Sequence, residues 1–397
     1  MIPASEALES ILKHTRQLKP GISKTVDSLH RILAENVKST IDSPPFDQSA
    51  MDGYAFRFGD HDLNDYLKCT GEIITGSSSK KEVKRGTAIR VFTGSMIPKG
   101  ADSVVPKENV LYEQNEITII DRTLLKRGIH IRKKSSQIKK GKVALDRDHR
   151  ITPASIGFLL SLGISKIKTI PSPKIRIIAS GNELVSGSRA LKGGQIFESN
   201  TGMLEAAIRQ MGIHSFTSHI VKDDEKRMQS AFKSALSSCN VLILSGGISV
   251  GEYDCTSEAL NTSGVIKVFH KVAQKPGKPF YFGKRNAQLI FALPGNPASV
   301  LTCFYEYVYP SLLKMMGYEN FRHLHVSRTC LDEYKKKPGM THFLKGYADD
   351  KTVKILPGQE SYILQSFAYS NCIIEVDSAC EFISAGQEVQ VHFIDAK

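Results

Sequence analysis

Four segments rich in glycine or proline carry acids, lysines and serines in a pattern that could do chemistry. They read SGNE, SGGISVGEYD, KVAQKPGKP and LPGNPAS, and each follows an apolar run. Glycines let a backbone approach a phosphate closely, a helix start adds partial positive charge, and lysines neutralise an anion. The segments therefore predict a site for an anionic, phosphate-bearing ligand. Their polar side chains include Glu183, Ser245, Ser249, Glu252, Asp254, Lys271, Lys275, Lys278 and Ser299.

The elements that must position these segments alternate between strands and helices from residue 173 to 317. Strands are predicted at PKIRIIASG, HSFTSHIV, NVLILSGG, VIKVFHKVA and AQLIFALPG. Helices are predicted at ESNTGMLEAAIRQMG with Asn200 as N-cap, at DEKRMQSAFKSALSSC, after Asp254 and over 297–316. This alternation predicts a doubly wound, largely parallel α/β sheet, in which ligands lie beyond the carboxyl ends of the strands.

The sequences on both sides of this sheet domain have strand patterns. GTAIRVFTG, DSVVPKENV and NEITIIDRT predict an inserted β-rich domain over 40–140, and TPASIGFLLSLG predicts a capped helix over 152–163. Runs such as THFLKGYA, NCIIEVDS and EVQVHFID predict a small C-terminal barrel or sandwich. The predicted fold class is multidomain α/β plus β. Its parts are an N-terminal linker or helical domain (1–39 and 141–172), the inserted domain (40–140), the sheet domain (173–318) and a C-terminal β domain (319–397).

Composition and charge exclude several classes of protein. Lys and Arg exceed Asp and Glu by 53 to 40, and eight of them lie in the acid-free run 124–142. Because that run lacks interleaved aromatics, we expect no nucleic-acid binding, and the run is either a solvated face or the rim of a cleft. Seven scattered cysteines without a CxxC pair indicate a reducing compartment. No apolar run approaches 18 residues and no signal-peptide cleavage site follows the N-terminus, so we expect a cytoplasmic protein without a membrane contact.

The segment PPFDQSAMDGYAF places Asp47 and Asp52 five residues apart. Asp-Gly is a common turn dipeptide and Pro-Pro keeps a backbone extended, so the local pattern alone fits an ordinary turn. Asp47 is expected to have a structural role as a turn cap. Whether Asp52 has a functional role depends on the rest of the chain.

Six ordered motifs together resemble the molybdopterin molybdotransferase family, which includes the E domain of gephyrin. They are PPFDQSAMDGYAF, VFTGSMIPKGADSVVPKENV, SGNELVSGSRALKGGQIFESN, SGGISVGEYD, KVAQKPGKPFYFG and LPGNPASVLTCF, and GQESYILQSFAYSNCIIEV extends the match to the C-terminal part. The resemblance implies an elongated homodimer, with an active site between the sheet domain of one subunit and the inserted domain of the other. It implies Mg²⁺-dependent insertion of molybdate into adenylylated molybdopterin with release of AMP. It also implies a molybdopterin adenylyltransferase and apo-molybdoenzymes as partners.

The same resemblance assigns roles to individual residues. Carboxylates suit Mg²⁺, and lysines suit anionic substrates. Lys271 and Lys275 are four residues apart and would share one strand face, as they would on a solvated strand. Ser299 and the N–H groups of LPGNPAS are candidates for holding molybdate. The implied catalytic residues are Asp52, Glu183, Asp254, Lys271 and Lys275, of which Glu183 and Asp254 hold the metal, and the implied substrate-binding residues are Thr93, Asp223, Ser245, Gly246, Gly247, Ser249, Lys278, Pro294, Gly295, Asn296 and Ser299.

Two departures from the family pattern keep other functions open. Ser135, Ser136 and Gln137 stand where the family has a stretch ending in an acid, and Asn182 stands where an Asp is common. A catalytically weakened paralogue that binds molybdopterin or acts as a scaffold is therefore one alternative. A molybdopterin adenylyltransferase is another, although the flanking β domains and SAMDGY argue against it. Tungstate has the same charge and nearly the same size as molybdate, so either oxyanion fits the residues that the resemblance implies.

Overall fold

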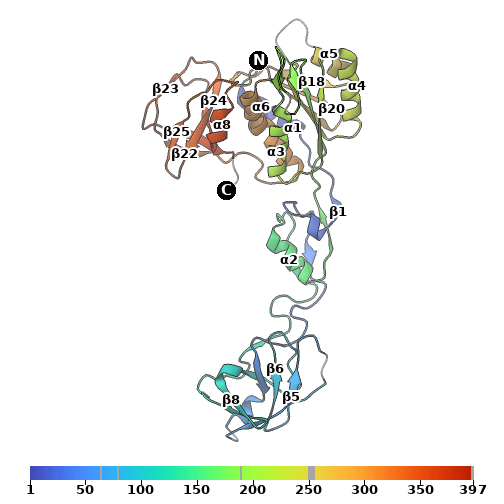
Figure 1. Cartoon of the computed structure of the whole chain (residues 1–397), viewed down its shortest axis with the longest axis vertical. Coiled ribbons are helices and arrows are strands. Elements are labelled where there is room, and N and C mark those ends of the chain that lie inside the picture. Colours follow the sequence, from blue (N-terminus) through green and yellow to red (C-terminus); the bar gives the residue numbers. More distant parts are fainter. Residues whose placement is uncertain (63–64, 78–79, 188–189, 249–254, 395–397) are drawn as a thin grey trace. The chain divides into compact units, whose positions relative to one another are not determined.

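The computed structural model describes the chain except for residues 63–64, 78–79, 188–189, 249–254 and 395–397. The chain forms two compact units (Figure 1). The larger unit contains residues 1–22, 29–34 and 168–397, and the smaller unit contains 23–28 and 35–167. We describe each unit by itself.

The larger unit contains the predicted doubly wound sheet. Its six strands have the order β16-β13-β17-β21-β20-β18. The first four are parallel, and β20 and β18 are antiparallel. The prediction of a largely parallel sheet is therefore confirmed, but it missed β20, which is connected to β21 by a tight turn with Asn286 at φ 54°. The strands are β13 Ile175–Ser180, β16 Phe216–Val221, β17 Val241–Ser245, β18 Ile266–His270, β20 Tyr281–Arg285 and β21 Gln288–Leu293.

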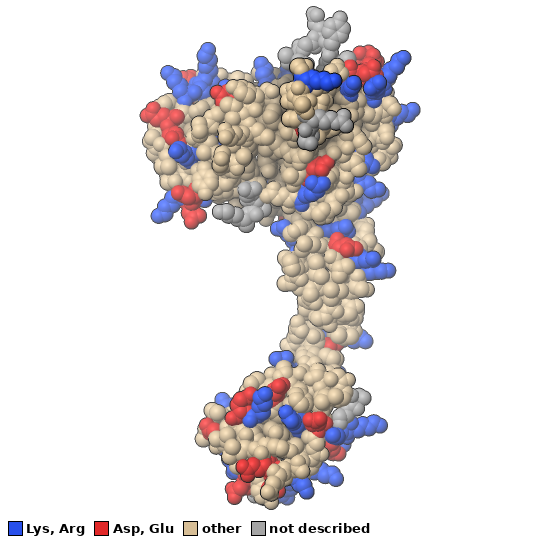
Figure 2. Space-filling view, in the orientation of Figure 1, with Lys and Arg blue, Asp and Glu red and all other residues tan. Residues whose placement is uncertain are grey.

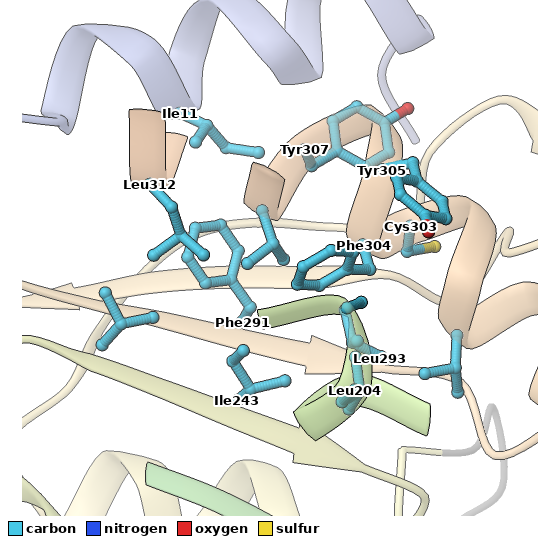
Figure 3. Close-up of a cluster of buried hydrophobic side chains, with 14 of the residues drawn as sticks. Ile11, Leu204, Ile243, Phe291, Leu293, Cys303, Phe304, Tyr305, Tyr307 and Leu312 are labelled. Atoms are coloured by element: carbon cyan, nitrogen blue, oxygen red, sulfur yellow. The ribbon is translucent and has the colours of Figure 1, made fainter. Parts of the chain in front are cut away.

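Helices cover both faces of this sheet because the strand residues alternate between two apolar clusters. Ile243, Phe291 and Leu293 pack with the helices of one face, and Figure 3 shows them beneath Ile11 and Leu312. Leu242, Leu244 and Ile290 pack on the other face against Phe232 and Leu260. Asn200 is the first residue of its helix and Ser199 is the cap, so the predicted N-cap was wrong by one position. The helices are α1 Ala4–His14, α3 Asn200–Gln210, α6 Pro297–Cys303, a π-helical turn Phe304–Val308 and α7 Tyr309–Met315 on the first face, and α4 Glu225–Leu236 and α5 Cys255–Thr262 on the second.

The C-terminal part of the larger unit is a closed barrel. Its strands pair in the sequence β24-β25-β22-β28-β26, and β26 pairs back with β24. Of the two predicted alternatives, the barrel is therefore correct. A short strand from the sheet domain, β19 Gln274–Lys275, extends the barrel by pairing with the start of β24. The barrel strands are β22 Val326–Cys330, β24 Thr341–Ala348, β25 Thr352–Ile355, β26 Cys372–Val376 and β28 Glu388–Phe393, and α8 Gln365–Tyr369 lies between β25 and β26.

The smaller unit contains a six-stranded sheet of order β7-β4-β6-β5-β9-β8 and the predicted helix α2 Pro153–Ser161. Thr152 and Ser155 form a reciprocal capping box at the start of α2. No described helix in either unit is long and apolar enough to cross a membrane. The sheet strands are β4 Gly53–Phe56, β5 Leu67–Ile73, β6 Thr87–Val91, β7 Ser103–Pro106, β8 Val110–Glu113 and β9 Glu116–Ile119.

The two-stranded pairs among the described residues are β1 Gly21–Lys24 with β12 Lys166–Thr169, β2 Val37–Lys38 with β11 Val143–Leu145, β3 Gln48–Ser49 with β10 Ile131–Arg132, β14 Leu184–Val185 with β15 Ile196–Phe197, and β23 Tyr334–Lys335 with β27 Phe382–Ile383.

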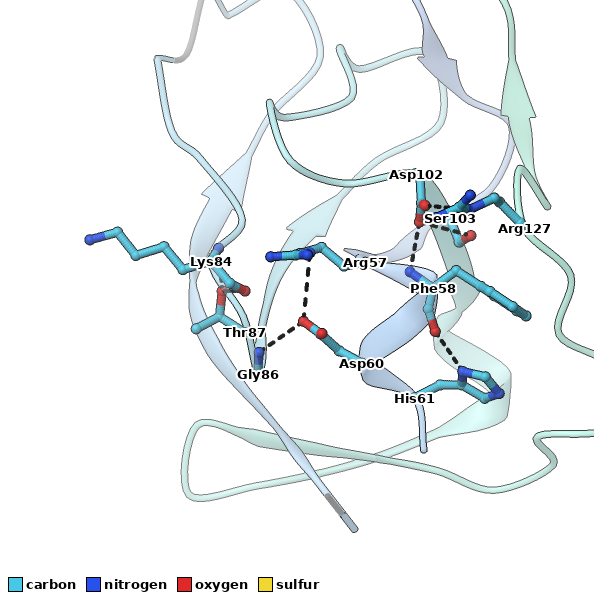
Figure 4. A network of polar contacts seen from close by, with 10 residues as sticks. All are labelled: Arg57, Phe58, Asp60, His61, Lys84, Gly86, Thr87, Asp102, Ser103 and Arg127. Carbon is cyan, nitrogen blue, oxygen red and sulfur yellow. Dashed lines mark hydrogen bonds and ion pairs between the residues drawn. The ribbon is translucent and has the colours of Figure 1, made fainter. Parts of the chain in front are cut away.

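Acids of the smaller unit pair with part of the basic run 124–142. Asp102 accepts from Arg127 Nε at 3.0 Å and from the N–H of Phe58 at 2.6 Å (Figure 4). Lys133 and Lys134 pair with Asp47 and Asp42 at 2.9 and 3.3 Å. On the face drawn in Figure 2, acidic and basic side chains are interspersed. At least three of the eight positive charges of the run are thus paired within the unit, which favours a structural, solvated face.

A buried group of ionisable side chains lies where the π-helical turn meets the barrel. Glu306 Oε1 lies 3.0 Å from Nε2 of His392 on β28, and the His323 and His392 rings stack with centroids 4.1 Å apart. Burial raises the pKa of Glu306 to about 7 and lowers those of His323 and His392 to about 4 and about 3. His325 and Glu375, 3.5 Å apart, also face this group. Burial therefore moves the titration of Glu306 toward neutral pH.

Glu306→Gln is expected to flatten the pH dependence of stability. The folded-state pKa of Glu306 is raised, so the stability from its bound proton is present below about pH 4.5 and is lost as pH rises through about 7. Since the two buried histidines are present in both proteins, wild type should lose about 1.4 kcal/mol relative to the variant between pH 6 and 8. Chemical denaturation at several pH values measures this, with the exposed Glu319→Gln as control. Parallel curves for wild type and Glu306→Gln would contradict the assignment.

Candidate functional site

The carboxyl ends of the parallel strands surround a cavity of about 630 Å³ in the larger unit. Strand pairing aligns Ala179 with Ser245 and Ser245 with Leu293, so the loops after β13, β17 and β21 leave the sheet at the same level. Three of the four predicted strand-end segments thus lie together, whereas KVAQKPGKP lines another cavity. The cavity is lined by residues that include the predicted Glu183, Asp223, Ser245, Gly246, Gly247, Gly295 and Asn296.

Two glycines make the floor of this cavity possible. Gly246 and Gly247 have φ values of 84° and 68°, which disfavour any other residue. A Cβ on Gly246 would lie 2.5 Å from the carbonyl oxygen of Ser180, and one on Gly247 would lie 2.3 Å from the Ser180 hydroxyl. The loop after β17 therefore packs directly on the end of β13, and its backbone is accessible to a ligand.

Asn200 fixes two of the strand-end loops. Its amide nitrogen Nδ2 donates to Ser245 Oγ at 2.9 Å and to the carbonyl oxygen of Gly295 at 2.8 Å. Its Oδ1 atom is buried and has no hydrogen-bond partner among the described residues. Buried polar atoms in native proteins are nearly always paired, so an unpaired acceptor in a cavity wall indicates a position that a ligand fills.

The acids of the cavity suit a Mg²⁺ ion. Both Glu183 carboxylate oxygens would lie within 2.8 Å of a Cβ on Gly181, so this side chain folds over the loop that it follows. Asp223 lines the same cavity. The described residues include no group of three His, Cys, Asp or Glu side chains that could hold a metal. Mg²⁺ is commonly bound through one or two carboxylates, substrate phosphates and water, so this donor set fits it.

A second cavity of about 350 Å³ adjoins the first at Asn296, which lines both. Lys275 and Lys278 contribute two exposed positive charges to its wall, and the buried Ser299 lies at the start of α6. Three proline residues, whose rings restrict the backbone, lie in the same wall. The lining residues are Gln274, Lys275, Pro276, Gly277, Lys278, Pro279, Pro294, Asn296, Ser299, Met340, Gln359 and Ser361.

Gln274 holds the lysine-bearing loop from below, which sequence reasoning missed. It is fully buried, its Nε2 donates to the carbonyl oxygen of Pro276 at 3.0 Å, and Tyr307 donates its hydroxyl proton to Gln274 Oε1. Gly277 packs so closely on Gln274 and Cys303 that a Cβ there would lie 2.7 and 2.6 Å from their side chains. Figure 3 shows Tyr307 and Cys303 on the adjoining helical segment. The loop is therefore anchored to the sheet domain's last helix.

Family models match three successive parts of the chain. They are the MoeA N-terminal region (domain I and II) over 2–163, a probable molybdopterin binding domain over 176–314, and the MoeA C-terminal region (domain IV) over 328–394. The molybdopterin molybdenumtransferase of Haemophilus influenzae is 35% identical over 372 residues, which cover 92% of this chain and 91% of that protein. The chain belongs to the molybdopterin molybdenumtransferase family.

Other relatives extend over nearly the full length. The molybdopterin molybdenumtransferase of Staphylococcus epidermidis is 30% identical, with 98% of this chain and 95% of that protein covered. A crystal structure of the molybdopterin biosynthesis MoeA protein from Pyrococcus horikoshii superposes with a TM-score of 0.76 at 28% identity, covering 99% of this chain and 100% of that chain. Fold and sequence thus agree on one family.

The smaller unit carries another residue pair expected from the molybdopterin molybdenumtransferase resemblance. Asp52 Oδ1 accepts from both the N–H and the hydroxyl of Thr93, each at 2.8 Å. These bonds, with the positive charges of Lys107 and Arg90, lower the pKa of Asp52. The next residue must be glycine, because a Cβ on Gly53 would lie 2.0 Å from the carbonyl oxygen of Val105. Asp-Gly is therefore more than a turn signal: the glycine lets two strands pair, and the acid is held ionised at their end.

The structure also gives Asp47 and Gln137 local roles. Asp47 accepts from Lys133 Nζ at 2.9 Å and from the Lys134 N–H at 2.8 Å, in agreement with its predicted structural role. Gln137, which replaces a family acid, accepts from the Ser43 hydroxyl at 2.8 Å, and its N–H donates to the Ser43 carbonyl at 2.9 Å. The neutral amide is thus part of the contact between two segments of the smaller unit.

One expectation about the larger unit was wrong. Lys271 and Lys275 do not share the face of one strand, because β18 ends at His270 and Lys271 adopts φ 71°. Lys271 lines neither of the two cavities. The N–H groups at the start of α6 are also not all available to an anion, since that of Ala298 donates to the carbonyl oxygen of Ser361 at 3.1 Å. The predicted Ser249 and Asp254, and Glu252 beside them, lie outside the described residues.

Three lining residues of the second cavity, Met340, Gln359 and Ser361, come from the C-terminal part of the larger unit. Gln359 and Ser361 follow β25, and Ser361 Oγ accepts from Asn296 Nδ2 at 2.8 Å. No spacing rule connects residues so far apart in the chain. The motif GQESY, which belongs to the family resemblance, was the available signal.

Gln274→Leu is expected to destabilise the larger unit by about 2–4 kcal/mol, because it leaves the Tyr307 hydroxyl and the Pro276 carbonyl buried without their partner. Thermal unfolding measures this, and the exposed Gln390→Leu on β28 is the matched control, expected within about 0.5 kcal/mol of wild type. Equal melting temperatures for the two variants would show that Gln274 does not support the loop.

Proposed function

We propose that this protein inserts molybdate into adenylylated molybdopterin, with Mg²⁺-dependent release of AMP. The observation that carries the proposal is the adjacency of two cavities of different character, which meet at Asn296. One has glycine-rich strand ends and carboxylates, and the other has two lysines. A reaction between a phosphate ester of a pterin and a small oxyanion needs such a pair of subsites side by side.

The first cavity suits the adenylylated pterin. Its volume of about 630 Å³ is in the range of sites for organic ligands, and its backbone at Gly246 and Gly247 can approach a phosphate closely. Asn200 Oδ1 offers an unpaired acceptor to a ligand N–H or hydroxyl group. Glu183, with Asp254, would hold the Mg²⁺ ion, which neutralises charge on the phosphoanhydride while bound.

The second cavity suits the oxyanion. Lys275 and Lys278 supply opposite charge to molybdate, and Ser299 supplies a hydroxyl at the helix start. Molybdate bound there would lie next to the pterin subsite through the shared wall at Asn296. Tungstate has the same charge, so we infer that it competes for the same subsite.

We further propose a homodimer in which Asp52 of the partner subunit completes the site. Support comes from the family resemblance and from the Thr93 contacts that keep Asp52 ionised. Within the dimer this carboxylate would orient the reacting groups or accept a proton. A molybdopterin adenylyltransferase would supply the substrate, and apo-molybdoenzymes would receive the product.

A catalytically weakened, molybdopterin-binding paralogue is the second candidate. The neutral amide of Gln137 in place of a family acid favours it. Retention of Glu183, Lys275 and the Asp52–Thr93 pair favours the enzyme.

AMP release from adenylylated molybdopterin with Mg²⁺ should depend on molybdate, and Asp52→Ala and Lys275→Ala should each lower its rate by about 10²-fold or more, since each removes a charge at the reacting groups. Chromatographic assay of AMP measures this, with the exposed Lys354→Ala on β25 as a control that keeps wild-type rates. Tight pterin binding without AMP release by wild type would instead identify the binding paralogue.

Mixing the two inactive variants tests the shared site. If the site is built from two subunits, a mixed dimer of Asp52→Ala and Lys275→Ala holds one intact site and one doubly changed site. Random reassociation should then restore about one quarter of wild-type activity, because half of the dimers are mixed. Absence of any recovery, with mixed dimers demonstrated by differential tags, would place both residues in the site of one subunit.

A further inference from the structure

Strand β24 of the barrel supports both walls of the second cavity. At its start, Thr341 and His342 pair with Gln274 and Lys275, so the lysine wall is hydrogen-bonded to β24. Farther along the same strand lies Lys345, whose side chain faces the opposite wall. That wall is the segment 358–363, which carries Gln359 and Ser361.

The ammonium group of Lys345 is buried and fully bonded to this segment. Lys345 is only 2% exposed, and its Nζ donates to the carbonyl oxygens of Gly358, Glu360 and Ile363 at 2.5, 3.2 and 3.0 Å. Burial lowers the pKa of Lys345, and the nearby Glu360 opposes that shift. An ammonium has three donors, so every one of them is used to fix the segment.

Two further side chains attach the segment to the same strand and to α8. Gln359 accepts from the Lys345 N–H at 3.0 Å and donates to the Lys345 carbonyl at 2.9 Å. Ser366 donates to the carbonyl oxygens of Pro357 and Gly358, both at 2.7 Å. The segment 358–363 has no regular secondary structure, so its position is set by these contacts.

The segment in turn contacts the sheet domain at the cavity. Ser361 accepts from Asn296 through its hydroxyl and from the Ala298 N–H through its carbonyl, at 2.8 and 3.1 Å. Since Asn296 also lines the first cavity, a shift of the segment would alter the junction of both subsites.

We propose that Lys345 is a positioning residue for oxyanion binding: through three carbonyl groups it holds segment 358–363 against Asn296 and so keeps the second cavity in shape. The inference rests on the proposed function, because it takes molybdate as the occupant of that cavity. Lys345 itself does not touch the oxyanion. Its effect should therefore fall on the KM for molybdate more than on kcat at saturating molybdate.

Lys345→Met and Lys345→Arg test this in the full-length enzyme, with the exposed Lys354→Met as matched control. Misplacement of one wall should raise the KM for molybdate about tenfold in Lys345→Met, with kcat changed by less than about threefold. The KM for adenylylated molybdopterin should stay within about twofold of wild type, and Lys345→Arg, which retains the charge, should recover part of the molybdate affinity.

Hydrogen exchange supplies a readout independent of activity. Amides of 358–363 should exchange faster in Lys345→Met, whereas those of β26 and β28 should be protected as in wild type. Ser366→Ala, which removes the neutral hydrogen bond that the hydroxyl shares between Pro357 and Gly358, should shift exchange and molybdate KM in the same direction by a smaller factor. It also provides the test if Lys345→Met does not fold.

The outcomes separate the inference from the proposed function. Faster exchange of the segment with an unchanged molybdate KM in Lys345→Met or Ser366→Ala overturns the positioning role. Unchanged exchange in both variants overturns the claim that these contacts hold the segment. If wild type releases no AMP in the presence of molybdate, the proposed function itself fails, whatever the variants do.

Discussion

The parallel register of β13, β17 and β21 is the constraint on which the site depends. It brings Ser180, Ser245 and Leu293 to one edge of the sheet, so three loops that are far apart in sequence share one cavity. The close packing of Gly246 and Gly247 on Ser180 follows from this register. Asn200 then joins the loops after β17 and β21 from the start of α3. A shift of one strand would separate the acids from the glycine-rich backbone.

The second cavity depends on a different interaction, the attachment of the C-terminal barrel to the sheet domain through β19 and β24. Gln274 belongs to this attachment and also bonds to Tyr307, so the last helix, the lysine loop and the barrel form one packed assembly. The barrel therefore contributes to the wall of the second cavity. The barrel core is the rigid scaffold, and the irregular segment 358–363 on that scaffold lines the second cavity. Binding residues commonly lie on loops that a rigid scaffold positions.

Sequence reasoning predicted the sheet, most of its helices and the convergence of three of the strand-end loops, since period-two and period-3.6 patterns report burial directly. It missed β20 because the hairpin turn at Asn286 lacks the glycine that usually marks such turns. It predicted that Lys271 and Lys275 share one strand face because it assumed that the strand continues through Lys271. Lys271 has a positive φ, which ends the alternation of side chains there. Gln274 and Lys345 could not be found, since a buried polar side chain is recognised by its partners, and those lie in other elements.

The proposed function depends on binding of the oxyanion in the cavity between the lysine loop and the barrel. Diffraction from crystals soaked in tungstate tests it most directly, because tungsten scatters X-rays anomalously and tungstate carries the charge of molybdate. We expect an anomalous peak within contact distance of Lys275, Lys278 and Ser299, and its loss in Lys275→Ala crystals. A peak confined to the strand-end cavity beside Gly246 and Gly247, with the lysine cavity empty, would show that the oxyanion does not bind at the lysine loop.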